Sequence, residues 1–404
     1  MLPGVTVMRR MIALGMMAAV ITVLGILAPV SATTGDDELT PEQIQALNEA
    51  REQGRTFFQQ RKYREAAEAY RRAAQMDSTD APTYFNLGLC YQSLNNNRDA
   101  IVALRRAVTL DPMFGPAHLE IAKVFLKQEN LEEAEREYHA TKRILADSVQ
   151  YLAAAEQGLA TVAVAYTNRA IVSLRQRKYP EARADAARAM ELAPEISRPF
   201  YIGGHIEESA RDYDAAERYY RAAVARAEDD ARRAEALEGV GRILNQRARD
   251  ADRDNNAAAA TRLREQAAEF LTQSAQADSS RATTFVNLGN TLFELARYEE
   301  AARALSHAEK LDPRDYKSPF KLAEAYMRLE RCSEAEQAAS RAIRLQPMNA
   351  SAHAVRAEAL ECLGRLQDAI NEYDEAKRDP RWRQRCEYKI KKLQEELSSS
   401  AQGR

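Results

Sequence analysis

The sequence predicts an all-α protein built as a stack of about nine similar helical hairpins. Two observations favour this fold class. The first is composition: the 404-residue chain is rich in alanine, the best helix former, and contains only 15 Gly and 13 Pro. This composition excludes collagen-like chains and Pro/Gly-rich disorder, and it disfavours sandwiches and barrels. The second is a pattern of 34 residues that repeats along the chain in one frame.

The chain begins with a segment typical of a secretory signal. Arg9 and Arg10 form a short positive region, residues 11–27 carry no charge, and Ala32 ends a small-residue cleavage motif. We therefore expect residues 1–32 to direct export and to be cleaved. The alternative is that residues 11–27 remain as an anchor in the inner membrane. In both cases the rest of the chain would be periplasmic or secreted.

Two segments, residues 81–114 and 282–315, display the repeat most clearly. Both contain aromatic-x-Asn-Leu-Gly, followed at the same offsets by Ala, Leu, Ala and Leu-Asp-Pro. This pattern resembles the tetratricopeptide repeat, in which small residues let two antiparallel helices pack closely. The resemblance implies a right-handed superhelical solenoid of about nine helix-turn-helix repeats, because no single hairpin can bury its apolar face alone.

The same frame divides the rest of the chain. Thr40 followed by Pro41 marks the start of the first helix within a leader at residues 33–46. The units expected after it are repeats 1–3 at 47–148, a helical insert at 149–162, repeats 4–5 at 163–230, an extended degenerate repeat at 231–281, repeats 7–9 at 282–383, and a basic capping helix and tail at 384–404. The extended repeat carries additional polar residues near 245–260, which we predict to lengthen its hairpin; the alternative is a hinge or a docking projection.

The charges and motifs argue against catalysis and against nucleic-acid binding. There are 58 basic and 60 acidic residues, so no global basic field attracts nucleic acid. The chain has no glycine-rich phosphate loop, no His-Glu-x-x-His and no Cys-x-x-Cys. We therefore predict no enzyme activity, no cofactor and no metal site. His118 and His353 occupy the fourth place of the repeat, where a bulky side chain packs, and we predict a packing role for both.

The four cysteines lie at positions 90, 332, 362 and 386. Export would place them in an oxidising compartment, where disulfides persist. In the repeat frame, Cys332 begins the second helix of one repeat and Cys362 ends the first helix of the next. Both fall at the same end of the stack, so we predict a Cys332–Cys362 disulfide. The alternative is four buried thiols that pack as small apolar groups.

The C-terminal region is strongly basic. Residues 377–392 contain eight basic and two acidic side chains. We expect a solvated capping helix with Tyr388, Ile390 and Leu393 on its apolar side, since terminal repeats need a polar cap. The alternative is weak contact with an anionic membrane.

The resemblance to the tetratricopeptide repeat also implies that the first helices line a concave groove for peptide segments. The sixth place of the repeat faces this groove, and an asparagine there can satisfy both the donor and the acceptor of a peptide bond. The groove candidates are Asn86, Asn168, Asn287, Asn290, Phe85, Tyr201, Phe320, Lys321 and Arg328. Other repeats lack this asparagine, and no complete basic clamp for a C-terminal carboxylate is present.

The predicted function is that of a non-catalytic exported scaffold or adaptor. It would bind protein or peptide segments and help to assemble an envelope or periplasmic complex. One alternative is an envelope-binding module that uses the basic tail to hold anionic lipid or a cell-wall polymer. Another is a lumenal co-chaperone, for which Asn349-Ala350-Ser351 supplies a glycosylation sequon.

Overall fold

The computed structural model describes residues 39–402, and within this range every element is a helix. The predicted signal or anchor, residues 1–32, lies outside the described residues. In chain order the helices are α1 (Pro41–Gln59), α2 (Tyr63–Met76), α3 (Ala81–Ser93), α4 (Asn97–Leu110), α5 (Gly115–Lys127), α6 (Leu131–Ile144), α7 (Val149–Arg175), α8 (Tyr179–Leu192), α9 (Ser197–Ala210), α10 (Tyr213–Ala225), α11 (Asp230–Arg253), α12 (Ala257–Ala277), α13 (Ala282–Glu294), α14 (Tyr298–Leu311), α15 (Lys317–Arg328), α16 (Cys332–Leu345), α17 (Ala350–Cys362), α18 (Leu366–Ala376) and α19 (Pro380–Gln402).

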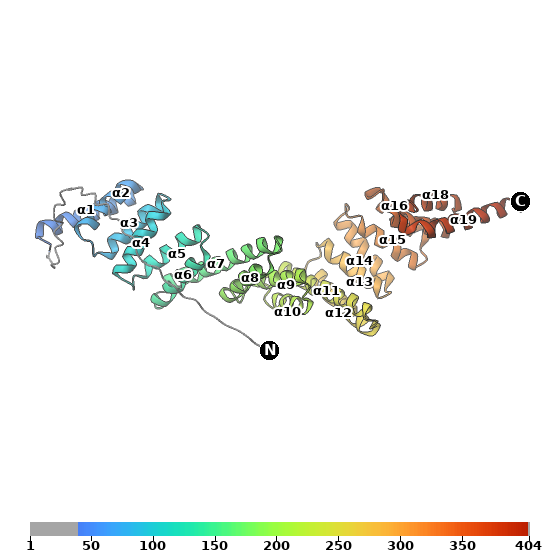
Figure 1. Ribbon diagram of the computed structural model, residues 1–404, viewed down its shortest axis with the longest axis horizontal. Helices are drawn as coiled ribbons and strands as arrows, with labels where there is room; N and C mark the ends of the chain where they lie inside the picture. Colours follow the sequence, from blue (N-terminus) through green and yellow to red (C-terminus); the bar gives the residue numbers. More distant parts are fainter. Residues whose placement is uncertain (1–38, 403–404) are drawn as a thin grey trace, which may run out of the picture.

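The helices form nine consecutive hairpins, α1/α2 to α17/α18, and α19 follows the last of them. Each hairpin packs against its neighbours in the sequence, so the stack is elongated, with α1 at one end and α19 at the other (Figure 1). The prediction of an all-α repeat solenoid is confirmed. Within residues 39–402, no helix combines the length and the apolar character that crossing a bilayer requires.

Close contact between the two helices of a hairpin explains the glycine of the repeat. A Cβ atom added to Gly88 in α3 would lie 2.6 Å from Cγ of Leu104 in α4. The equivalent Gly289 in α13 would place a Cβ atom 2.5 Å from Cγ of Leu305 in α14. Both leucines are fully buried, so the space beside each glycine is already filled. The repeat therefore specifies the hairpin through the fit of small and large side chains.

Every hairpin turns through one residue in the left-handed conformation. These residues are Arg61, Asn95, Glu129, Arg177, Arg211, Asn255, Ala296, Glu330 and Gly364, with φ between 57° and 72°. Only one of them is glycine, although glycine alone adopts this conformation without a steric penalty. Asn95 and Asn255 also tolerate it, because asparagine is enriched in this region. The other six turns are therefore held in place by the packing of their helices rather than by local preference.

This strain predicts a stabilising substitution at Ala296, an exposed turn residue between α13 and α14 with φ of 59°. Ala296→Gly should raise the free energy of unfolding by about 1 kcal/mol, because glycine removes the Cβ clash. Urea denaturation followed by circular dichroism measures the change. Ala153→Gly, at an exposed position inside α7, is the matched control and should instead lower stability by about 1 kcal/mol. Equal destabilisation by both variants would contradict the assignment of strain.

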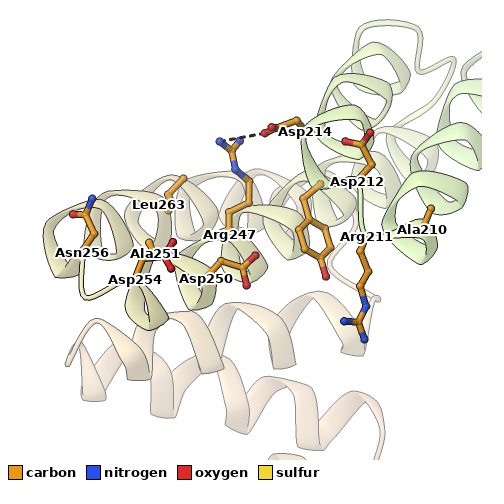
Figure 2. A pocket seen from close by; sticks show the side chains of 11 residues that line it. Ala210, Arg211, Asp212, Asp214, Arg247, Asp250, Ala251, Asp254, Asn256 and Leu263 are labelled. Atoms are coloured by element: carbon orange, nitrogen blue, oxygen red, sulfur yellow. Dashed lines mark ion pairs between the residues drawn. The ribbon is translucent and has the colours of Figure 1, made fainter. Parts of the chain in front are cut away.

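Two hairpins depart from the common length. The residues predicted as an insert, 149–162, are continuous with the first helix of the next repeat in the 27-residue helix α7. The residues near 245–260 lengthen a hairpin formed by α11 (24 residues) and α12 (21 residues), which is closed by a short turn around Asn255. Beside this hairpin lies a cleft that is walled by the α9–α10 turn and by α11 (Figure 2). Charged side chains line it, and Arg247 crosses it to Asp214 with a nitrogen–oxygen distance of 3.4 Å.

Candidate functional site

Two adjoining clefts in the C-terminal half of the solenoid form the candidate site. One has a volume of about 320 Å³ and lies where α11 and α12 meet α13 and α15. The other, of about 450 Å³, extends from α13 and α15 to α17 and the start of α19. Asn290 and Lys321 line both clefts, which we together call the C-terminal groove. The other main residues of the groove are Asn245, Arg249, Phe293, Glu294, Lys317, Phe320, Asn349, Ser351 and Arg381.

Lys321 lines both clefts of the C-terminal groove and lies between two aromatic rings. Its Nζ lies 5.3 Å from the ring centre of Phe293 and 5.8 Å from that of Phe320. The same ammonium group is 2.6 Å from Oε2 of Glu324, one turn further along α15. Cation–π contact and the ion pair therefore fix the lysine among two half-buried aromatic rings. The result is a surface with both apolar and hydrogen-bonding character.

Asn290 supplies an unsatisfied acceptor beside this lysine. Its Oδ1 atom is buried and accepts no hydrogen bond from any residue in the described part of the chain. Buried amide oxygens are almost always paired, because an unpaired one loses its hydration without compensation. Asn290 lines both clefts of the groove, so an N–H donor of a segment bound there is a candidate partner for this oxygen. Of the nine groove candidates, Asn290, Phe320 and Lys321 are the three that the structure brings together.

The other six candidates either lie outside the C-terminal groove or already form contacts within the protein. The Asn287 side chain donates from Nδ2 to Oε1 of Glu238, at 3.1 Å, so this amide is already used within the protein. Tyr201 is 9% exposed and forms a 2.9 Å hydrogen bond with Nε2 of His205, so it belongs to the core rather than to an open pocket. Phe85, on α3, packs edge-on against Phe114, and its neighbour Asn86 is partly exposed. Asn168 on α7 and Arg328 at the end of α15 are exposed.

Comparison with known families supports the interpretation of these hairpins. Four segments match family models of the tetratricopeptide repeat: residues 54–95, 81–114, 282–315 and 320–381. The chain contains tetratricopeptide repeats. The C-terminal groove lies largely within the last two matched segments, on the first helices of consecutive tetratricopeptide repeats.

Several known proteins resemble parts of this chain. DnaJ homolog subfamily C member 7 homolog of Dictyostelium discoideum is 27% identical over 107 residues, which cover 26% of this chain and 20% of the relative. Hsp70-Hsp90 organizing protein 1 of Glycine max is 36% identical over 67 residues, covering 17% of this chain and 12% of the relative. This chain thus spans a fifth or less of the length of these relatives. Among solved structures, the MamA protein is similar with a TM-score of 0.38 and 21% identity, over 45% of this chain and 89% of that chain.

A buried carboxylate, which sequence reasoning missed, connects two consecutive hairpins next to the groove. Glu238 of α11 is 3% exposed. It accepts hydrogen bonds from Arg281 Nη2 at 2.9 Å, Thr284 Oγ1 at 2.9 Å, Thr283 Oγ1 at 3.2 Å and Asn287 Nδ2 at 3.1 Å, as well as from Arg281 Nε. Arg281 is the N-cap residue of α13, and the other donors lie in the first two turns of that helix. One feature of the sequence could have indicated this site. Glu238 occupies the fifth place of its repeat, where other repeats carry an aromatic residue: Phe85, Tyr201 or Phe320.

The cysteines fall into a bonded pair and two isolated thiols. A disulfide joins Cys332, at the start of α16, to Cys362, at the end of α17, with a Cα–Cα distance of 6.1 Å. Cys90 and Cys386 are free and buried. Burial raises the pKa of the Cys90 thiol to about 12, which leaves it protonated and unreactive at neutral pH. The disulfide links consecutive repeats at the end of α17 that lies away from the groove residues Ala350 and Ser351.

Two histidines of the repeat frame make the same pair of hydrogen bonds. Nδ1 of His118 lies 2.6 Å from Glu137, and Nδ1 of His353 lies 2.6 Å from Glu372. The second ring nitrogen of His353 lies 2.9 Å from the Pro347 carbonyl oxygen. The hydrogen bond with the carboxylate raises the pKa of each histidine above its ordinary value. Both nitrogens face acceptors, so the imidazolium form fits each site best.

This arrangement predicts a pH-dependent stability. Because the folded-state pKa is raised, the protonated histidine stabilises the fold below pH 6.5, and the contribution is lost as pH rises through the folded-state value. The free energy of unfolding of the wild type should therefore fall between pH 6 and pH 9. In His353→Phe this fall should be smaller by about 1 kcal/mol. Urea denaturation at several pH values measures this difference. His139→Gln, at an exposed position, should keep the wild-type pH dependence, and an unchanged profile in His353→Phe would contradict the assignment.

The basic C-terminal region is largely neutralised within the protein. Six of the eight basic side chains of residues 377–392 form ion pairs: Lys377, Arg378, Arg381, Arg385, Lys389 and Lys391. Arg385 reaches Glu358 at 2.6 Å and Lys389 reaches Glu361 at 2.9 Å, both on α17. This pairing favours a capping role for α19 over contact with anionic lipid. The apolar side of α19 is formed by Cys386, Ile390 and Leu393, whereas Tyr388 is 68% exposed, so its predicted burial was wrong.

Proposed function

We propose that the protein is a non-catalytic scaffold that binds a segment of a partner protein in the C-terminal groove. The observation that carries the proposal is the buried, unpaired Oδ1 of Asn290 beside the amphipathic surface around Lys321. A peptide backbone offers N–H donors at regular intervals, and its side chains offer apolar groups for Phe293 and Phe320. One relative is named as an organizing protein for Hsp70 and Hsp90, which agrees with a role in bringing proteins together.

We further propose that the protein works outside the cytoplasm, as part of an envelope or periplasmic complex. Two features support export. The N-terminal pattern of residues 1–32 is typical of a secretory signal. The Cys332–Cys362 disulfide is of a kind that persists in oxidising compartments and is rare in the reducing cytosol.

A lumenal co-chaperone receives less support. Its sequon residue Asn349 is the N-cap of α17, where Oδ1 accepts a hydrogen bond from the Ala352 amide at 3.1 Å. Asparagine is among the preferred residues at this position, so helix capping explains its presence without a glycan.

Site-specific photocrosslinking in the native cell tests the groove. A photoreactive residue at Lys317, which is exposed and lines the groove, should capture a discrete protein that the same residue at exposed Arg344 on α16 does not. Asn290→Leu and Lys321→Glu, each combined with the Lys317 probe, should reduce that capture by about tenfold. Equal capture from both positions, or capture that ignores both substitutions, would contradict groove binding. Asn287 is unsuitable for the probe because its amide is bonded to Glu238.

A further inference from the structure

We propose that the protein has a second docking site, on the other side of α13, that binds an amphipathic α-helix of a partner protein. The site is a cleft of about 730 Å³ between α12 and α14, with α13 as its floor, which we call the α12–α14 cleft. It is separate from the C-terminal groove, and it adds a second kind of partner segment to the proposed function.

The floor of the α12–α14 cleft is apolar. Phe285, Leu288 and Leu292 lie at i, i+3 and i+7 on α13 and therefore share one face of that helix. The C-terminal groove is lined instead by Asn290, Phe293 and Glu294, which occupy the other side of the same helix. Ala268 of α12 and Ala304 of α14 complete the floor with small side chains. The two sites can therefore be occupied independently.

The two walls of the cleft carry opposite charges. Glu265 and Glu269, both exposed, form the edge on α12. Arg297 and Arg303, also exposed, form the edge on α14 together with Glu300, which pairs with Arg297. Among the residues that the structure describes, the one ion pair of the cleft is that between Arg297 and Glu300, and both belong to the α14 side.

Neighbouring second helices are held together in other parts of the solenoid. Arg341 of α16 pairs with Glu309 of α14 at 2.6 Å. The Arg221 guanidinium of α10 lies 4.8 Å from the ring centre of Phe270 in α12. Between α12 and α14 the corresponding space is open. Arg297 is paired with Glu300 and also interacts electrostatically with Glu265 across the cleft, whereas Glu269 and Arg303 form no ion pair with any residue that the structure describes.

The dimensions and charges of the cleft fit one amphipathic helix. The lining residues of α12 extend from Glu265 to Gln276, about 16 Å or three helical turns. An amphipathic helix of this length presents an apolar stripe that can face Phe285, Leu288 and Leu292. Its edge toward α12 would carry Lys or Arg, and its edge toward α14 would carry Asp or Glu. If the bound helix ran in the opposite direction, its basic edge would face α14 and its acidic edge would face α12. The opposite charges of the two walls therefore also select the direction of the partner chain.

Three synthetic helical peptides test the proposal, with fluorescence anisotropy on the full chain as the readout. All carry the same leucine stripe; one has a basic and an acidic edge, one has two acidic edges and one has two basic edges. The wild type should bind the mixed-edge peptide about tenfold more tightly than either of the others. Glu265→Lys combined with Glu269→Lys makes both walls basic and should transfer the preference to the peptide with two acidic edges.

Two further variants separate this site from the groove and from nonspecific adsorption. Thr272→Trp places a large side chain at the cleft and should abolish binding of the mixed-edge peptide. Lys321→Glu, in the C-terminal groove, should leave it unchanged, so failure of the groove proposal would not affect this result. Equal affinity for the three peptides, no binding by the wild type, or indifference to the wall substitutions would overturn the proposal. The substituted wall residues are exposed, and circular dichroism verifies that the variants keep their helices.

Discussion

Replacing Glu238 with alanine is expected to lower the free energy of unfolding by about 3–5 kcal/mol. The carboxylate is 3% exposed and accepts hydrogen bonds from Arg281, Thr283, Thr284 and Asn287. Its removal leaves a partly buried guanidinium and two hydroxyl groups without their acceptor, which is more destabilising than the loss of an exposed ion pair. Because the donors lie on α13 and the acceptor on α11, the damage should be concentrated where the lengthened hairpin meets the C-terminal repeats.

Urea denaturation and hydrogen exchange measure the effect and its location. Protection should fall most in α11 and α13. Glu238→Gln keeps the shape but not the charge, and should lose about half as much stability as alanine. Glu265→Ala, which removes an exposed glutamate from α12, is the control and should change stability by less than about 0.5 kcal/mol. A Glu238→Ala variant within 1 kcal/mol of the wild type would refute the role of the carboxylate.

Loss of the disulfide is expected to destabilise the C-terminal repeats by about 3–4 kcal/mol, the chain-entropy value for a loop of this size. Cys332 and Cys362 are separated by 30 residues and connect α16 to α17. Reduction of the wild type with dithiothreitol should produce the same loss as Cys332→Ser. The Cys332→Ser variant should not respond to the reductant further. Wild-type stability that is independent of dithiothreitol would show that the bond makes no contribution.

The same disulfide reports on export. Rapid alkylation of intact cells should find Cys332 and Cys362 oxidised in the wild type. Leu14→Arg interrupts the uncharged segment 11–27 and should retain the chain in the cytoplasm with both thiols reduced. Val149→Arg, at an exposed position of α7, is the control and should leave the pair oxidised. Oxidised cysteines in both arginine variants would contradict the proposed link between export and the bond.

The repeat pattern was sufficient to predict the hairpins because the contacts that define them are local. Gly88 meets Leu104 within one hairpin, and the pattern that contains both residues is visible in 34 consecutive positions. The left-handed turns were not predictable in this way. Arg61, Glu129 and Ala296 have no preference for positive φ, so only the packed helices on either side impose that conformation.

Patterns of charge were less informative than patterns of apolar residues. The basic stretch 377–392 indicated a possible binding surface, yet Arg385 and Lys389 pair with Glu358 and Glu361 of α17. These glutamates lie almost thirty residues earlier, in a helix whose position beside α19 depends on the stacking of complete repeats. An ion pair between such distant residues leaves no periodic signal in the sequence.

The clearest contrast concerns two asparagines of α13. The sequence by itself determined that Asn287 and Asn290 lie on one helix of a repeat, one turn apart, because the 34-residue pattern fixes that helix. It could not distinguish the two side chains, which have the same chemistry. Only the tertiary structure decided that Asn287 is bonded to a glutamate 49 residues earlier, whereas Asn290 keeps an unpaired oxygen beside the groove. The physical reason is that hairpins form from local packing, whereas the availability of a polar group depends on every neighbour that the stacked repeats bring within hydrogen-bond distance.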